Sequence, residues 1–171
     1  MKSDTIAAIA TALSDAGIGI IRISGPEAIA VANRVVVNKK KEHTLKNWQT
    51  HTIHYGFVEE NGTILDEVMV SVMKAPRSYT TEDTVEINCH GGVLLTKRVL
   101  EAVLHAGARM AEPGEFTKRA FLSGRIDLSE AEAVMDLIQA KNQFSMQASI
   151  KQLRGSVAEK VKSLRAALLY E

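Results

Sequence analysis

Two charged side chains stand out because each interrupts an apolar, strand-like segment. Glu86 lies in TVEINC, on the face that carries small polar groups, while the opposite face is apolar. A carboxylate in this place either belongs to a half-exposed strand or points into a pocket. In a pocket it would accept two parallel N–H bonds from a planar, amidine-like edge such as that of a pterin. Arg22 lies in IGIIRIS, and an arginine among apolar residues is rarely left unpaired. It either forms a structural ion pair or binds a ligand carboxylate or phosphate. Together the two residues predict a polar site at one end of a sheet.

The segment Cys89-His90-Gly91-Gly92 is typical of a strand end, a glycine turn and a helix start. Free N–H groups at a helix start attract an anion or a polar ring edge, and glycines let a ligand approach the backbone. An ordinary tight turn requires the same pattern, so both interpretations stay open. Cys89 and His90 are neighbours on a strand, so their side chains project to opposite faces of the sheet. We therefore do not expect them to act as nucleophile and base. We expect Cys89 to be a small core residue.

The sequence lacks the residues that several other kinds of site require. The chain has no G-x-x-x-x-G-K-[S/T] loop for nucleotide phosphates and no spacing that predicts a metal site. With a single cysteine it cannot form an internal disulfide. A net charge of +1 and an aromatic content of 5% do not favour an RNA-binding surface. We interpret the lysines at 39–41 as an ordinary solvated segment.

The elements that must position these residues form an α/β part and a helical part. With 171 residues, 46% of them hydrophobic, the chain is long enough for one domain with an appendage. Apolar runs, glycines and prolines predict the α/β elements in this order: strands at 5–12 and 18–24, a helix from Pro26 to about Asn38, a hairpin over 51–74 with its turn at Asn61-Gly62, a strand at 84–89, a helix at 93–105 and a short strand at 108–111.

After Gly114 no further strand is predicted. The segment EFTKRAFL predicts a short helix, and Ser129 with Glu132 predicts a capping box that opens the next one. From about Asn142 to the end the pattern predicts one long amphipathic helix with a weak point at Gly155. Its apolar stripe consists of Ile150, Leu153, Val157, Val161, Leu164 and Leu168. Because one helix cannot bury its own stripe, we expect a longer protein or another subunit to cover it.

Neither a membrane-spanning run nor a signal-peptide pattern is present in the sequence. We therefore expect a cytoplasmic protein with no membrane partner.

Four segments resemble one known family in the family's own order: DTIAAIAT, GIGIIRISG, APRSYTTEDTVEINCHGG and EPGEFTKRAFLSGRIDLSEAEAVMDLI. They are similar to the tRNA modification GTPases of the MnmE (TrmE) family. The resemblance implies an α+β fold for residues 1–118, with a mixed sheet resembling the tetrahydrofolate-binding domain of aminomethyltransferases, and a role in dimerisation. It implies an all-α segment for 119–171, the first helices of a helical domain. The family's GTPase domain and C-terminal cysteine motif are absent from this chain.

The same resemblance implies a function. This chain would bind 5-formyltetrahydrofolate or a related folate near the interface of a homodimer. The full-length protein, with the FAD-dependent partner MnmG, would place an aminomethyl-type group on the wobble uridine of certain tRNAs. Sites for GTP, Mg and K would lie outside this chain, so we expect these 171 residues alone to be inactive as a GTPase.

Three residues match the family's folate-contacting positions: Arg22 in GIxIxRxSG, Glu86 in VExxxHGG and Arg125 in FLSGRIDL. The resemblance implies that Glu86 meets the pterin edge and that both arginines meet anionic or carbonyl groups. It implies no catalytic residue and no metal ligand in this chain. Two departures affect the loops: residues 12–17 replace a Pro-Pro-Gly-containing loop, and Thr81 stands where many relatives carry glycine. Cys89 does not correspond to the family's C-terminal cysteine.

Two alternatives to a folate-binding module remain. The chain is also consistent with a structural dimerisation module that binds no ligand. An independent enzyme of the aminomethyltransferase type would turn over a folate one-carbon unit unaided, which we do not expect.

Overall fold

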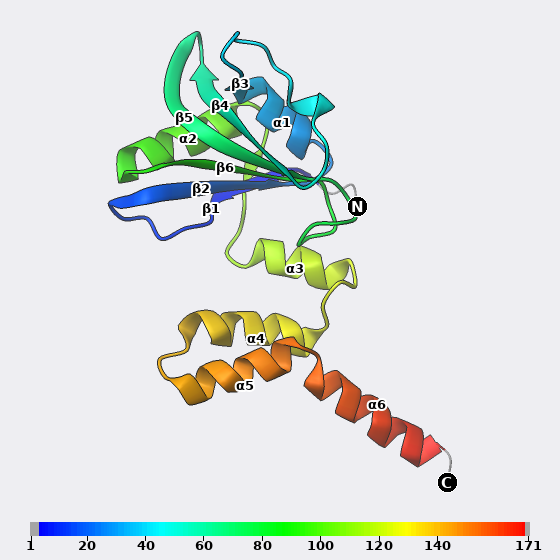
Figure 1. The fold of residues 1–171 in the computed structure, drawn as a ribbon. Coiled ribbons are helices and arrows are strands. Elements are labelled where there is room, and N and C mark those ends of the chain that lie inside the picture. Colours follow the sequence, from blue (N-terminus) through cyan, green and yellow to red (C-terminus); the bar gives the residue numbers. More distant parts are fainter. Residues whose placement is uncertain (1–3, 170–171) are drawn as a thin grey trace. The chain divides into compact units, whose positions relative to one another are not determined.

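The computed structural model describes residues 4–169 and divides into two compact units between Phe116 and Thr117. The first unit contains a mixed sheet with helices packed on it, and the second is helical (Figure 1).

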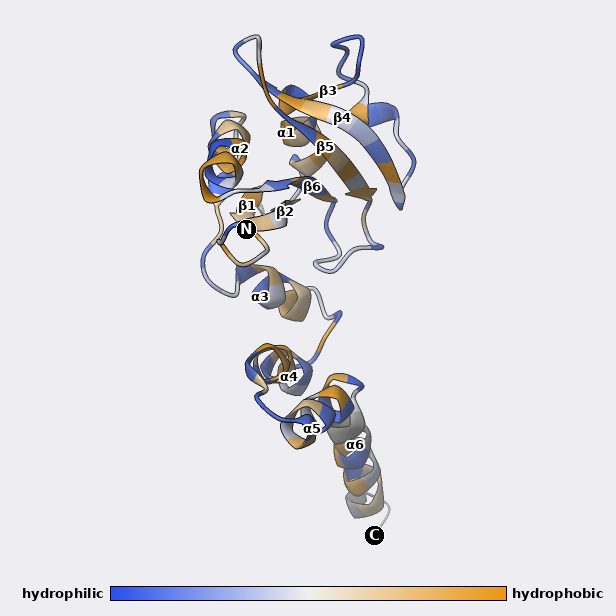
Figure 2. Ribbon diagram, turned by 60° about the vertical axis from the view of Figure 1, so that its left-hand side comes forward, coloured by the Kyte–Doolittle hydropathy of each residue, from blue (hydrophilic) through white to orange (hydrophobic). Residues whose placement is uncertain are grey.

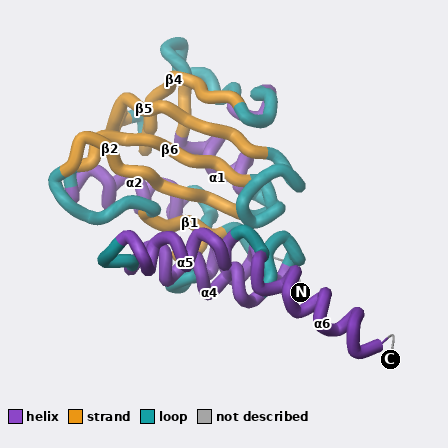
Figure 3. Tube along the Cα trace, turned by 60° about the horizontal axis from the view of Figure 1, so that its bottom comes forward, coloured by secondary structure: helices purple, strands orange, loops and turns teal. Residues whose placement is uncertain are grey.

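Within the described residues, the first unit contains one seven-stranded sheet in the order β3-β4-β5-β6-β2-β1-β7. Figure 3 labels β4, β5, β6, β2 and β1 of this sheet. Neighbouring strands are antiparallel except for the parallel pair β1–β7. The strands are β1 (Ile6–Ile9), β2 (Ala16–Ser24), β3 (Val36–Val37), β4 (Thr52–Glu60), β5 (Thr63–Met73), β6 (Thr84–Gly91) and β7 (Arg109–Met110). This mixed α/β architecture agrees with the predicted class, and the predicted strands and hairpin are present.

Helices α1 (Ala28–Val35) and α2 (Val93–His105) cover one face of this sheet. The covered face is the hydrophobic core, because β-branched residues alternate along the central strands and point toward the helices. Fully buried examples are Ile21, Val70, Val85 and Ile87. The opposite face holds the intervening residues, among them Arg22 and Glu86, and is here called the open face.

The structure corrects the end of the first predicted helix. Helix α1 stops at Val35, and Val36 and Val37 form strand β3 instead of a final helical turn. They pair with Val58 and Phe57 of β4. Two consecutive β-branched residues favour this exchange, because a strand leaves their side chains less crowded than a helix does.

The loop between β5 and β6 is held against β2 by a buried network of polar side chains. The Ser24 hydroxyl donates to Glu82 Oε2 at 2.8 Å and lies 2.7 Å from Thr80 Oγ1. Ser24 and Thr80 are both buried, so this network fixes the loop beside the end of β2 that carries Arg22.

Thr81, in the same loop, has a φ of 64°, in the left-handed region. This region is unfavourable for a β-branched residue and easy for glycine. We expect Thr81→Gly to raise the free energy of unfolding by about 0.5–1 kcal/mol, since the relief of strain exceeds the entropy that glycine adds to the unfolded chain. Urea unfolding measures the change. Thr80→Gly is the matched control and should destabilise, so an unchanged or lower stability for Thr81→Gly would contradict the explanation.

Helix α3 (Glu115–Leu122) crosses the division between the units, and α4 (Leu128–Gln139), α5 (Gln143–Leu153) and α6 (Ser156–Leu169) follow it. The capping box of α4 is formed by Asp127 and Glu130, not by Ser129 and Glu132 as predicted. Ser129 is already inside the helix, and its hydroxyl donates to Asp127 Oδ1 at 2.8 Å.

The predicted long C-terminal helix is two helices. Gly155 has a φ of 79°, which ends α5 before α6 begins at Ser156. Hydrophobic and hydrophilic residues are interspersed along α4, α5 and α6 (Figure 2). The exposed apolar side chains of this unit include Ile138, Phe144 and Leu164. The side chains of Val157 and Leu168, also part of the predicted stripe, lie outside the described residues.

Candidate functional site

Arg22 and Glu86 form an ion pair on the open face of the sheet. They are directly opposed residues of β2 and β6, so their side chains leave the sheet together. The Arg22 Nε–H donates to Glu86 Oε1 at 2.8 Å, and Nη2 lies 2.7 Å from the same oxygen. The side chains are 32% and 22% exposed, respectively. The structural ion pair predicted as one alternative for Arg22 is therefore present.

The pair retains unused hydrogen-bonding capacity. Both contacts use Oε1 of Glu86; within the described part of the chain, Oε2 of Glu86 and Nη1 of Arg22 have no hydrogen-bond partner. A partly exposed acceptor and a partly exposed donor thus stand side by side. This combination suits a planar group that carries both N–H and C=O functions.

Phe116 forms a third part of this site. The guanidinium carbon of Arg22 lies 5.7 Å from the centre of the Phe116 ring, within the range of a cation–π contact. The preceding residue, Glu115, is bound by Arg109 at 2.7 Å, and Arg109 also binds Asp4 at 2.7 Å. These two carboxylates raise the pKa of Arg109, which stays charged. The network anchors the first turn of α3 and thereby places the Phe116 ring at Arg22.

A histidine follows the pair along the same face of β6. Glu86, Asn88 and His90 alternate on that strand, so all three belong to the open face. Asp66 of β5 accepts two hydrogen bonds of 2.8 Å from His90, one from the backbone N–H and one at Nδ1. Asp66 is 8% exposed and His90 is 70% exposed. The Asp66 carboxylate raises the pKa of His90 and leaves Nε2 as the ring nitrogen available to a ligand.

A cavity of about 250 Å³ adjoins this histidine. Its lining comes from β2, β4, β5 and β6: Gly17, Ile18, Tyr55, Glu67, Met69, Asn88, Cys89 and His90. Glu67 accepts a hydrogen bond from the Tyr55 hydroxyl and raises the pKa of Tyr55. The lining therefore combines apolar side chains with hydrogen-bonding groups.

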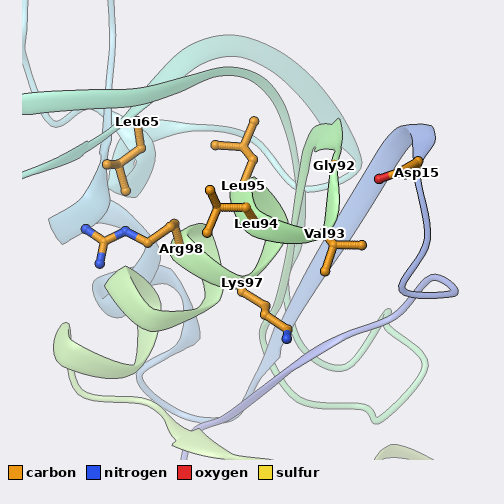
Figure 4. A pocket seen from close by; sticks show the side chains of 8 residues that line it. All are labelled: Asp15, Leu65, Gly92, Val93, Leu94, Leu95, Lys97 and Arg98. Atoms are coloured by element: carbon orange, nitrogen blue, oxygen red, sulfur yellow. The ribbon is translucent and has the colours of Figure 1, made fainter.

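A larger hollow of about 670 Å³ lies elsewhere, at the first turn of α2 (Figure 4). It is lined by Asp15, Leu65, Gly92, Val93, Leu94, Leu95, Lys97 and Arg98. Arg98 forms ion pairs with Glu60 and Glu101, with nitrogen–oxygen distances of 3.1 Å in both. Neither Arg22 nor Glu86 lines this hollow, so the hydrogen-bonding groups of the pair do not face it.

The Cys89-His90-Gly91-Gly92 segment is explained largely by packing. Cys89 is buried, and its thiol donates to the Gly19 carbonyl oxygen at 3.3 Å. Burial raises the pKa of the Cys89 thiol, as expected for a core residue and not for a nucleophile. A Cβ atom at Gly91 would lie 2.4 Å from the Ala16 carbonyl oxygen, so glycine is required there by the contact between β6 and β2.

Arg125, the third expected folate contact, belongs to the second unit. It is exposed and follows α3, and its backbone N–H donates to the Ala120 carbonyl oxygen at 3.0 Å. Arg125 also takes part in a further interaction within the chain. The structure thus brings together two of the three sequence-predicted residues, Arg22 and Glu86, and describes the third in another unit.

Sequence reasoning missed Phe116, Asp66 and the cavity beside His90. Part of the signal was available, because His90 is four residues from Glu86 on one strand and must share its face. Asp66 and Phe116 offered no comparable signal, since both meet the site through pairing and packing between distant segments.

Among the described residues no helix has the length and apolar content to cross a membrane. The same part of the chain contains no group of three or more His, Cys, Asp or Glu residues arranged to hold a metal ion.

Comparison with known proteins adds independent information. Residues 5–125 match the family model described as "GTP-binding protein TrmE N-terminus". The whole chain is 58% identical to a protein of Lachnoclostridium phytofermentans named tRNA modification GTPase MnmE, of which it covers 37%. Proteins with the same name from Listeria welshimeri and Bacillus subtilis are 54% and 52% identical over 99% and 97% of the chain, which covers 36% of each. This chain therefore spans little more than a third of the relatives it matches, and it belongs to the TrmE N-terminal domain family, the N-terminal part of the tRNA modification GTPases named MnmE.

Proposed function

We propose that the first unit of this chain binds 5-formyltetrahydrofolate or a related folate at Arg22 and Glu86. The observation that carries the proposal is the partly exposed ion pair with one unused carboxylate oxygen and one unused guanidinium nitrogen. The carboxylate is suited to the N–H groups of a pterin edge, and the guanidinium is suited to a carbonyl or carboxylate of the same ligand. When bound, the folate would supply the one-carbon unit.

The second part of the proposal is that this unit mediates homodimerisation. Ile18, Ile53 and Met69 are exposed apolar residues of the open face, at 61%, 63% and 45% exposure. Exposed apolar side chains grouped on one face favour contact with another protein surface. A second copy of the chain is the proposed partner, and Arg125 is proposed as a further folate contact.

For the full-length protein we propose GTP hydrolysis coupled to tRNA modification. The relatives are named tRNA modification GTPases, and this chain covers 36–37% of their length. GTP, Mg and K would bind in the remaining part, with the FAD-dependent protein MnmG as partner and the wobble uridine of certain tRNAs as the modified base. The cytoplasm is the proposed location.

The test of folate binding is a calorimetric titration of this chain with 5-formyltetrahydrofolate. We expect the wild type to bind at micromolar to millimolar ligand and both Glu86→Ala and Arg22→Ala to lose measurable affinity. Glu101→Ala, which removes an exposed carboxylate of α2 paired with Arg98, is the matched control and should bind as the wild type does. Absence of binding by the wild type would favour the alternative, a purely structural dimerisation module.

A further inference from the structure

The open face has a second hydrogen-bonding position that continues the Arg22–Glu86 site along β6. Four residues of a strand span about 13 Å, which is the separation expected between the backbone positions of Glu86 and His90. Asn88 stands between them on the same face. An elongated ligand held at Glu86 and extending along β6 in this direction meets Asn88 and then His90.

The cavity lies at the His90 end of this line. The residues that line it include Asn88, His90, Ile18, Met69 and Tyr55. Its volume of about 250 Å³ is more than an aromatic ring requires, since benzene occupies an apolar cavity of about 150 Å³ in a protein. Ile18 and Met69 offer apolar surface for such a ring. Both also belong to the apolar group proposed for the dimer contact, so the ring would lie at the edge of that contact, as expected for a folate near the interface of a homodimer.

His90, which lines the cavity, is held by two hydrogen bonds to Asp66. Asp66 accepts hydrogen bonds from the backbone N–H and at Nδ1 of His90, so Nε2 is the ring nitrogen left for a ligand. The other titratable groups that line the cavity are Glu67 on β5, Tyr55 on β4 and Cys89 on β6. Glu67 and Tyr55 are joined by a hydrogen bond, and the Cys89 thiol donates to the Gly19 carbonyl oxygen. With Asp66 favouring the protonated ring, Nε2–H is a donor for a carbonyl or carboxylate oxygen.

We propose that Asp66 and His90 form a second subsite for the ligand of the Arg22–Glu86 pair, in which His90 Nε2–H binds an acceptor oxygen on the ligand's distal portion and the adjoining cavity holds that portion's aromatic ring. This inference rests on the proposed folate function, because a folate joins its bicyclic ring to an aromatic ring that carries a carbonyl. His90 and Asp66 would thus determine the preference for a complete folate over a free pterin.

The experiment compares two ligands and several variants by calorimetric titration of the same chain. The ligands are 5-formyltetrahydrofolate and 5-formyl-6-methyltetrahydropterin, which lacks the aminobenzoylglutamate portion. We expect His90→Ala to lower the affinity for the complete folate about tenfold, as loss of one charge-assisted hydrogen bond does. The affinity for the truncated pterin should stay unchanged. His90→Gln should lose less affinity for the complete folate, because the glutamine amide still donates a hydrogen bond. His105→Ala removes an exposed histidine that is also paired with a carboxylate, Glu60, and is the control.

Each outcome has a distinct meaning. Wild-type binding of the complete folate with no loss in His90→Ala would overturn the subsite and leave the proposed function intact. An equal loss for both ligands would indicate a structural role for His90 and would also overturn the subsite. No wild-type binding to either ligand would overturn the proposed function and the subsite together.

Discussion

Gly91→Ala is expected to destabilise the first unit by about 2–3 kcal/mol, the upper part of the range for overpacking a filled interior. A Cβ atom there would lie 2.4 Å from the Ala16 carbonyl oxygen and 2.8 Å from the Ile18 carbonyl carbon. Both obstacles are backbone atoms, so no side-chain rotation relieves them, and β2 must move away from β6. Urea unfolding, monitored by circular dichroism, measures the loss.

The neighbouring glycine provides the matched control for this prediction. Gly92 is the N-cap of α2, and a Cβ atom at Gly92 would meet no atom within 4 Å. Gly92→Ser should therefore change stability by no more than about 0.5 kcal/mol, with a gain favoured because serine is a preferred N-cap. Equal effects at the two glycines would contradict the assignment of Gly91 to strand packing.

Exchange of the charges of Arg22 and Glu86 is expected to separate folding from ligand binding. Glu86→Arg alone places two guanidinium groups on directly opposed positions and should cost about 1–2 kcal/mol of unfolding free energy. Arg22→Glu should do the same with two carboxylates. The double variant restores opposite charges across β2 and β6, and we expect it to recover most of the lost stability.

Folate affinity should not recover with stability in that double variant. The exchanged pair presents a donor where the pterin edge requires an acceptor, so we expect affinity to stay about 30-fold below wild type, in the range for a lost charged hydrogen bond. Thermal unfolding and calorimetric titration of all four proteins supply the measurements. Wild-type affinity in the double variant would show that the ion pair acts on the fold alone.

The local pattern of the sequence determined most of the secondary structure. Helix α2 was predicted with the bounds that the structure shows, Val93–His105, because a glycine precedes its amphipathic run and another glycine follows it. The hairpin of β4 and β5 was predicted from Asn61-Gly62, and both residues have positive φ. In each of these elements the controlling residues are neighbours along the chain.

The secondary-structure predictions were wrong where the local sequence preferences allowed more than one structure. Val36 and Val37 continued the helical pattern but formed β3, since pairing with β4 was available in the folded unit. Asp127 and Ser129 are both good N-caps, and the reciprocal bonds with Glu130 favoured Asp127. Gly155 was recognised as a weak point, yet only its left-handed φ shows that α5 ends there.

For the candidate site, the sequence by itself determined which residues are unusual: a carboxylate on the polar face of its strand, and a guanidinium inside an otherwise apolar strand. Only the tertiary structure decided that these two are directly opposed and bonded, that Phe116 lies against the guanidinium, and that Asp66 orients His90 beside a cavity. The physical reason is that alternation along a strand assigns a side chain to a face, whereas the register between strands and the packing of α3 assign its neighbours. Those neighbours lie up to 94 positions away in the chain, as for Arg22 and Phe116, beyond the reach of any local pattern.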